Sequence, residues 1–181
     1  MDGWTFDGTI GSGDFFWESI GGNPGGYLQS IDLVGFQGEA IAPAKFLGDW
    51  SSLDESGQLS FDHRLFTIGN AISSFAPFSA TISGPGGSAI WVADEVFMAP
   101  TDWVSFQVPI AESSWTVQSG TWGALLADVQ ELRFPTETIS NNDGNSGDNT
   151  GLDNVILSAI PEPTSLLLAA ISIIGLSIRR R

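Results

Sequence analysis

The stretch from Gly57 to Phe66, GQLSFDHRLF, decides the fold class of this chain. Its side chains alternate: one face carries Leu59, Phe61, His63 and Leu65, and the other carries Ser60, Asp62 and Arg64. A repeat of two residues is that of a β-strand that packs one face on a core and turns the other to water. The stretch therefore predicts a half-buried strand and a β-rich fold around it.

Other apolar runs bounded by glycine or proline predict further strands. We expect them at residues 27–34, 79–83, 89–96, 103–110, 115–118 and 154–160. Their spacing of about ten residues is typical of two packed antiparallel sheets.

One segment has a different repeat. After Thr121, a favourable helix N-cap, apolar residues fall at helical intervals, at Trp122, Leu125, Leu126, Val129 and Leu132. We therefore predict a mainly β protein: an antiparallel β-sandwich of the jelly-roll, galactose-binding-like kind with one short α-helix, over residues 1–160.

Composition bounds the function. The chain has 181 residues, enough for one domain, and a net charge of -15. Before Pro161 it holds three basic residues (Lys45, Arg64 and Arg133) against all 21 acidic ones except Glu162, a net of about -17. Such a body repels phosphate backbones, so we expect no nucleic-acid partner. The absence of cysteine excludes disulfides and thiolate chemistry.

The C-terminal segment differs from the rest. Residues 164–178, TSLLLAAISIIGLSI, carry no charge and are followed by Arg179, Arg180 and Arg181. This pattern predicts a hydrophobic, membrane-type helix with its arginines in the cytoplasm and the body outside. Roughly 15 residues rise only about 22 Å, less than the ~30 Å hydrocarbon core, so the span would be short.

The order Pro161-Glu162-Pro163, apolar segment and terminal arginines resembles the PEP-CTERM sorting signal of bacterial exported proteins, a tail also catalogued under an ice-binding-protein C-terminal name. The resemblance implies an exosortase-type membrane protease as partner, cleavage near Pro161, and display on the cell surface or in an exopolysaccharide-rich matrix. Such proteins normally carry an N-terminal signal peptide, whereas the start at Met1 is neither basic nor apolar. We therefore expect the true start to lie upstream.

Several segments of the body follow one another in a recognisable order: APAKFLGD at 42–49, GQLSF at 57–61, ISG at 82–84, VPIAESSW at 108–115, residues 122–132, and GLDNV at 151–155. In that order they resemble the laminin IV type A domain, also called laminin B. The resemblance implies a β-sandwich with a structural or adhesive role in a matrix and no catalytic activity. The many tryptophans and the missing cysteine-rich repeats depart from the animal modules.

A polar loop suggests a cation site. Between residues 141 and 153, hard oxygen ligands are offered by Asp143, Asn145, Asp148 and Asp153. The spacing does not match an EF-hand, whose twelfth position requires glutamate and is Asn154 when counted from Asp143. The loop is thus either a structural calcium site or a solvated turn rich in Asn and Asp.

Tryptophan provides the candidate ligand-binding residues. Flat rings cover the apolar faces of sugars, so Trp91, Trp103 and Trp115 are candidates for a sugar-stacking platform. The alternative is that they belong to the core of the sandwich. Alternation alone does not decide which way they point.

Catalysis has weak support. His63 shares an apolar strand face with Phe61 and Leu65, which predicts a packed core histidine. Candidate carboxylates for glycoside hydrolysis, Asp94, Glu95 and Glu112, are suggested by residue type alone.

We therefore expect a non-enzymatic, exported surface or matrix protein with an adhesive or structural role. The alternative is a carbohydrate-binding module that attaches to exopolysaccharide. A glycoside hydrolase is a third, more remote hypothesis.

Overall fold

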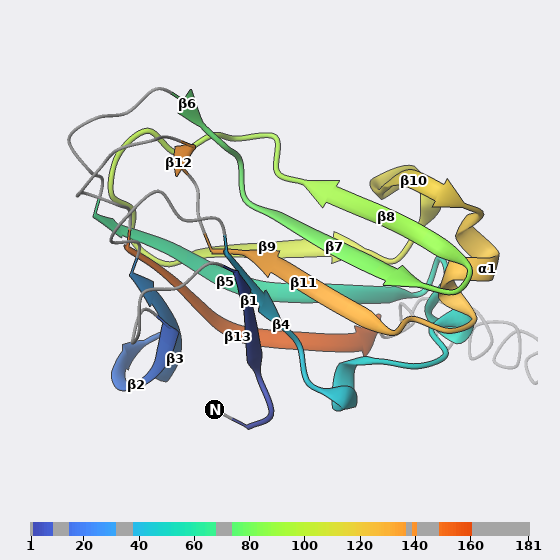
Figure 1. Ribbon diagram of the computed structural model, residues 1–181, viewed down its shortest axis with the longest axis horizontal. Helices are drawn as coiled ribbons and strands as arrows, with labels where there is room; N and C mark the ends of the chain where they lie inside the picture. Colours follow the sequence, from blue (N-terminus) through green and yellow to red (C-terminus); the bar gives the residue numbers. More distant parts are fainter. Residues whose placement is uncertain are drawn as a thin grey trace, which may run out of the picture.

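Two antiparallel sheets face each other in the computed structural model, which describes residues 2–8, 15–31, 38–67, 74–136, 139–140 and 149–160. Figure 1 shows the central strands of both sheets running roughly along the long axis of the molecule. The predicted antiparallel β-sandwich with one short helix is confirmed for these residues.

The six-stranded sheet has the order β1-β4-β11-β7-β8-β10. Its strands are β1 (Thr5–Gly8), β4 (Gly38–Ile41), β11 (Glu131–Pro135), β7 (Ser79–Gly84), β8 (Gly87–Val92) and β10 (Thr116–Gly120). β7 and β8 form a tight hairpin in which Gly84 lies opposite Gly87. The edges of this sheet are β1 and β10.

The five-stranded sheet has the order β2-β3-β13-β5-β9. Its strands are β2 (Phe15–Gly22), β3 (Gly25–Ile31), β13 (Asn149–Ala159), β5 (Gly57–Thr67) and β9 (Val104–Pro109). The remaining elements are β6 (Ser74–Phe75) paired with β12 (Ile139–Ser140), the helix α1 (Trp122–Leu126), and the 3₁₀ turns η1 (Ala44–Phe46), η2 (Ser51–Leu53) and η3 (Glu112–Ser114).

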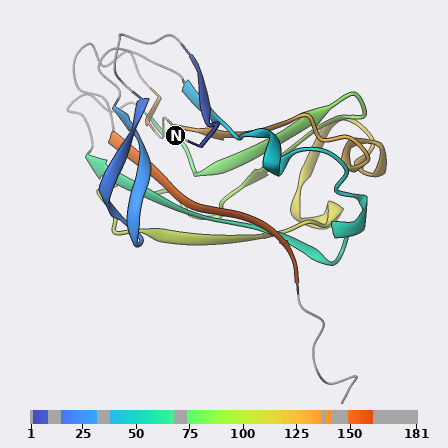
Figure 2. The same ribbon diagram turned by 90° about the horizontal axis from the view of Figure 1, so that it is seen from below.

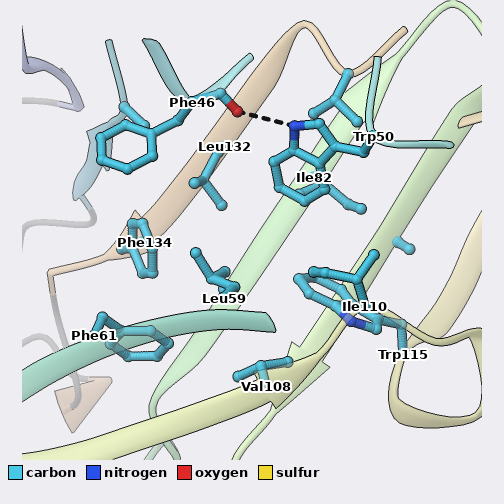
Figure 3. Close-up of a cluster of buried hydrophobic side chains, with 14 of the residues drawn as sticks. Phe46, Trp50, Leu59, Phe61, Ile82, Val108, Ile110, Trp115, Leu132 and Phe134 are labelled. Atoms are coloured by element: carbon cyan, nitrogen blue, oxygen red, sulfur yellow. Dashed lines mark hydrogen bonds between the residues drawn. The ribbon is translucent and has the colours of Figure 1, made fainter. Parts of the chain in front are cut away.

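The core lies between the sheets. The alternation of β5 is as expected: Leu59, Phe61 and Leu65 are almost fully buried. Phe61 meets Phe134 of β11 edge to face, with ring centroids 4.9 Å apart. Figure 3 shows this cluster and the hydrogen bond of 3.0 Å that the indole N–H of Trp50 donates to the Phe46 carbonyl. Aromatic and aliphatic burial of this kind is the main source of stability of the sandwich.

The predicted helical repeat is correct only at its start. α1 ends at Leu126, and Leu132 lies in strand β11 rather than in a helix. Val129 exchanges two backbone hydrogen bonds of 2.8 Å with Gly48, which draws the chain out of the helix and into the sheet. Both Val129 and Leu132 are buried. Core residues of α1 and of the segment that leads into β11 therefore fell at the same intervals as one face of a longer helix.

The largest differences in strand boundaries concern β8 and β13. β8 ends at Val92 rather than at residue 96, and β13 begins at Asn149 rather than at residue 154. The first residues of β13 are polar and do not show the apolar pattern of a strand, although they pair with β3 and β5.

The predicted hydrophobic helix at 164–178 lies outside the described residues. Among the helices that the structure does describe, none has the length and apolar character needed to cross a membrane.

Candidate functional site

A cleft of about 80 Å³ opens between the two sheets, on the side where their edge strands β1 and β2 lie. Figure 2 shows the two blue strands of the β2–β3 hairpin on the same side of the sandwich as β1. The lining combines aromatic, aliphatic and polar side chains: Trp4, Trp17, Leu28, Lys45, Phe46, Leu152, Asp153, Asn154 and Val155.

Trp17 forms one wall from the edge strand β2. It pairs in register with Leu28 of β3, so its side chain lies on the face of the hairpin that carries core residues. The ring lies against Gly26, where an added Cβ would come within 2.4 Å of Trp17 Cζ2. The absence of a side chain at Gly26 therefore lets the indole lie flat on the hairpin, and Trp17 stays 50% exposed.

Trp4 forms part of the opposite wall, just before β1. Its ring centroid lies 5.8 Å from that of Phe46 and 6.0 Å from that of Phe134. These contacts fix one side of the indole against the core, and the ring is only partly buried. The cleft thus has one tryptophan on each wall, both held by packing before any ligand arrives.

Asp153 and Asn154 supply polar groups from a bulge in β13, between Asp153 and Ile156. The carboxylate of Asp153 accepts hydrogen bonds from the backbone N–H groups of Asn23, at 2.6 Å, and Asn154, at 2.8 Å. The Asn154 amide donates to Asp62 at 2.7 Å and to the Asn23 carbonyl. Bulges often re-aim side chains beside binding sites, and here the bulge fixes two of them at the cleft.

Lys45 brings the one cation of the lining. Its ammonium forms an ion pair with Asp2 and lies 5.3 Å from the centroid of the Phe46 ring. The hydrogen bond from Lys45 lowers the pKa of Asp2, so this carboxylate stays charged at neutral pH.

This arrangement suits a sugar. The apolar C–H faces of a pyranose stack on indole rings, and its hydroxyl groups need hydrogen-bond partners such as carboxylate and amide oxygens. Ligand sites in general are concave, mostly apolar and completed by a few fixed polar groups. The cleft has these properties.

The tryptophans predicted to bind ligand do not form one platform. The Trp115 ring is only 6% exposed, and its indole N–H donates to the Pro109 carbonyl at 2.9 Å. Trp91 lies between the sheets, 5.8 Å from Phe61 in an edge-to-face pair. Both rings pack against the core, so neither fits the proposed stacking role.

Trp103 lies elsewhere, over the central strand β13. Its centroid is 5.3 Å from that of Tyr27 and 5.9 Å from that of Phe66, and all three rings crowd the position of Gly151. Its indole N–H donates to the Gly21 carbonyl at 3.0 Å, which ties the β2–β3 hairpin to the outer face of the five-stranded sheet. A ligand role for Trp103 stays a prediction.

Of the predicted calcium ligands only Asp153 is described, and its carboxylate is engaged by backbone N–H groups. Asp143, Asn145 and Asp148 lie outside the described residues, as do Pro161 and everything after it. Within the described ranges, no group of three acidic or histidine side chains could hold a metal ion. The calcium site stays a prediction.

Neither Trp4 nor Trp17 was among the residues predicted to bind ligand. The available signal was Gly26, two residues before Leu28, the cross-strand partner of Trp17, because a hairpin needs a side-chain-free position if a large ring is to lie flat across it. The cleft itself depends on how far the two sheets diverge, which no local pattern encodes.

The C-terminal segment matches a known motif, the PEP-CTERM protein-sorting motif, over residues 159–181. This signal marks the chain as an exported protein of the cell surface. Among curated proteins, no significant relative of the sequence was found. The ice-binding name of the tail has no independent support.

Solved structures share the fold of the body. The family 11 carbohydrate-binding module of the cellulosomal cellulase Lic26A-Cel5E of Clostridium thermocellum aligns with a TM-score of 0.53 and 19% identity, over 89% of this chain and 90% of that chain. The family 30 module of the cellulosomal cellulase Cel9D-Cel44B of the same organism aligns with a TM-score of 0.54 and 11% identity, over 86% and 87%.

The L4b domain of human laminin alpha-2 aligns less well, with a TM-score of 0.48 and 11% identity over 68% of this chain and 70% of that chain. This likeness supports no conclusion about function, and the resemblance to laminin IV type A stays a prediction. What the comparisons establish is the β-sandwich fold that carbohydrate-binding modules also have.

Proposed function

We propose that this exported protein is a non-catalytic carbohydrate-binding protein that holds a sugar between Trp4 and Trp17. The observation that carries the proposal is the pair of tryptophans on opposite walls of one cleft, with Asp153 and Asn154 beside them. Two indoles on facing walls cover both sides of a pyranose ring, and each removes apolar C–H surface of the sugar from water, at about 25 cal/mol per Å².

The size of the cleft fits a small part of a glycan. Its volume of about 80 Å³ corresponds to about six water molecules at ~10–15 Å³ each, roughly the bulk of one sugar ring. We therefore expect a single ring to enter the cleft while the rest of the glycan stays outside.

The structural neighbours favour this function over the adhesive role inferred from the laminin resemblance. Two of them are carbohydrate-binding modules that match this chain over most of its length. A family 11 module has been solved in complex with a β-1,3-1,4-mixed-linked tetrasaccharide, which makes mixed-linked glucan a reasonable first probe.

The cleft gives little support for hydrolysis. Glycosidases need a pair of carboxyl groups about 5–10 Å apart across the scissile bond. Among the described residues that line the cleft, Asp153 is the one carboxylate. The sequence candidates Asp94, Glu95 and Glu112 are not part of that lining.

The sorting motif supports the proposed setting. It begins at Ala159, the last residue of β13, so the folded body and the signal are contiguous. We expect an exosortase-type protease to process the tail, the hydrophobic segment to hold the chain in the membrane until then, and the body to reach exopolysaccharide outside the cell.

The test is a calorimetric titration of the full chain, in a sugar-free detergent, with mixed-linked β-glucan. Trp17→Ala should weaken binding by at least about tenfold, or about 1.4 kcal/mol. Ile20→Ala is the matched control, since Ile20 is 77% exposed on the same strand and does not line the cleft. Unchanged binding by Trp17→Ala, or equal loss in both variants, would refute the proposal.

A further inference from the structure

The body has three basic side chains, and each of them already has an acidic partner. The other three arginines of the chain are Arg179 to Arg181, within the sorting motif. An anionic ligand could pair with one of these three side chains only if that side chain were not already held by other groups of the protein.

Arg133, on the six-stranded sheet, is paired with three carboxylates. Its guanidinium contacts Asp7 and Glu39 at 2.9 Å and Glu131 at 3.0 Å, and it is 20% exposed. These hydrogen bonds, that to Glu131 first, raise the pKa of Arg133 further above its usual value. Three carboxylates around one cation leave this site with net negative charge.

Arg64 is committed on the five-stranded sheet. Its Nε donates to the Thr101 carbonyl at 3.1 Å, one terminal nitrogen lies 3.9 Å from Asp102, and the guanidinium stacks 4.5 Å from the centroid of the Phe66 ring. A planar cation held by hydrogen bond and ring contact is not free to reach a ligand in the cleft.

Lys45 is the basic residue in the lining of the cleft, and its ammonium is paired with the carboxylate of Asp2. Asp153 adds a second carboxylate to the same site, so the described groups around the cleft carry one positive charge and two negative ones. An anionic sugar would have to share the Lys45 ammonium with Asp2, which is held at high effective concentration because it belongs to the same chain.

We propose that the cleft selects uncharged glycans and rejects sugars that carry carboxylate, sulfate or phosphate. This inference rests on the proposed function of the cleft. An acidic sugar would find no unpaired cation among the described residues, and it would approach a body with a net charge of about -17 from the sequence. A neutral sugar needs only the two indoles and the hydrogen-bonding groups.

The test compares matched polymers. Neutral glucan, mannan and galactan are each titrated into the full chain beside the same polymer oxidised at C6 to the uronate. We expect at least tenfold weaker binding of the oxidised form near 50 mM salt, with the difference narrowing towards 500 mM as charges are screened.

Two variants test the origin of the selectivity. Asp2→Ala frees Lys45 and should strengthen binding of the oxidised polymers by several-fold while leaving the neutral ones unchanged. Asp102→Ala removes the acidic partner of Arg64, which does not line the cleft, and should change the binding of neither kind of polymer.

Equal binding of a neutral polymer and its oxidised form would overturn the selectivity while leaving carbohydrate binding in place. Tighter binding of the oxidised forms would overturn it as well. If no polymer of either kind binds, the proposed function fails and this inference fails with it.

Discussion

Burial sets the chemistry of His63, the single histidine. The side chain is 3% exposed, its ring centroid lies 3.7 Å from that of Phe78, and Nδ1 has no hydrogen-bond partner within the described structure. Burial lowers the pKa of His63 to about 3, against a smaller opposing effect of the hydrogen bond with the Pro135 carbonyl. His63 is therefore a neutral core residue at physiological pH, as its strand position indicated.

This burial predicts acid sensitivity. An unfolded histidine takes up a proton near pH 6.5 and the folded one only near pH 3, so stability is complete above pH 6.5 and falls as the pH drops towards 3. The loss can reach about 5 kcal/mol, a large part of a typical domain's stability. Urea unfolding between pH 4.5 and 7 should show this slope.

A substitution distinguishes the contribution of His63 to this pH dependence from that of the carboxylates. His63→Phe should flatten the slope between pH 4.5 and 6.5, because the carboxylates with lowered pKa values, Asp2, Asp49 and Glu131, add their own slope mainly below their ordinary pKa values of 3.8 to 4.5. An unchanged slope in this variant would mean that His63 is not its cause.

At the scale of elements, the β2–β3 hairpin positions the Trp17 wall. Its turn is fastened to the five-stranded sheet, where Asp62 accepts hydrogen bonds from the side-chain amides of Asn23, at 3.1 Å, and Asn154, at 2.7 Å. Asp62 is only 6% exposed, so this fastening is well protected from water. Buried charge-assisted hydrogen bonds of this kind contribute more than exposed ones.

Loss of this fastening should loosen the hairpin. Asp62→Ala leaves two amide donors unpaired, and we expect faster hydrogen exchange of the β2 amides and weaker glycan binding through Trp17. Ser60→Ala, on the same face of β5, is the control and should change neither. Unaltered exchange in β2 would show that the hairpin is held by other contacts, such as those of Trp103.

Some elements could be predicted from the sequence and others could not, for physical reasons. The alternation of β5 was sufficient because its inner face is apolar and its outer face polar. The run from Trp122 to Leu132 misled, since buried residues of a short helix and of β11 happened to share a helical interval. The direction in which a tryptophan points depends on the register of its strand, and for Trp17 also on the space above Gly26 of the neighbouring strand. Neither can be derived from the sequence of one strand alone.

At the scale of the molecule, the sorting motif begins where the fold ends. Ala159 pairs with Gly57, and the Ile160 N–H donates to the Ser56 carbonyl at 2.6 Å. Processing near Pro161 would therefore leave β13 complete.

Truncation tests this arrangement. A chain ending at Ile160 should melt at the temperature of the full body, whereas a chain ending at Asp153 loses the part of β13 that pairs with β5 from Ser60 to Gly57 and should not fold. Circular dichroism distinguishes the two. Unfolding of the chain that ends at Ile160 would show that the tail contributes to the body's stability.

The proposed function depends above all on sugar binding between Trp4 and Trp17. The most direct measurement is the NMR shift of the indole N–H signals of the 7 tryptophans on addition of mixed-linked β-glucan oligosaccharides. If sugar binds in the cleft, the signals of Trp4 and Trp17 move while those of the buried Trp50 and Trp115 stay in place. Shifts confined to the other tryptophans, or no shift at all, would contradict it.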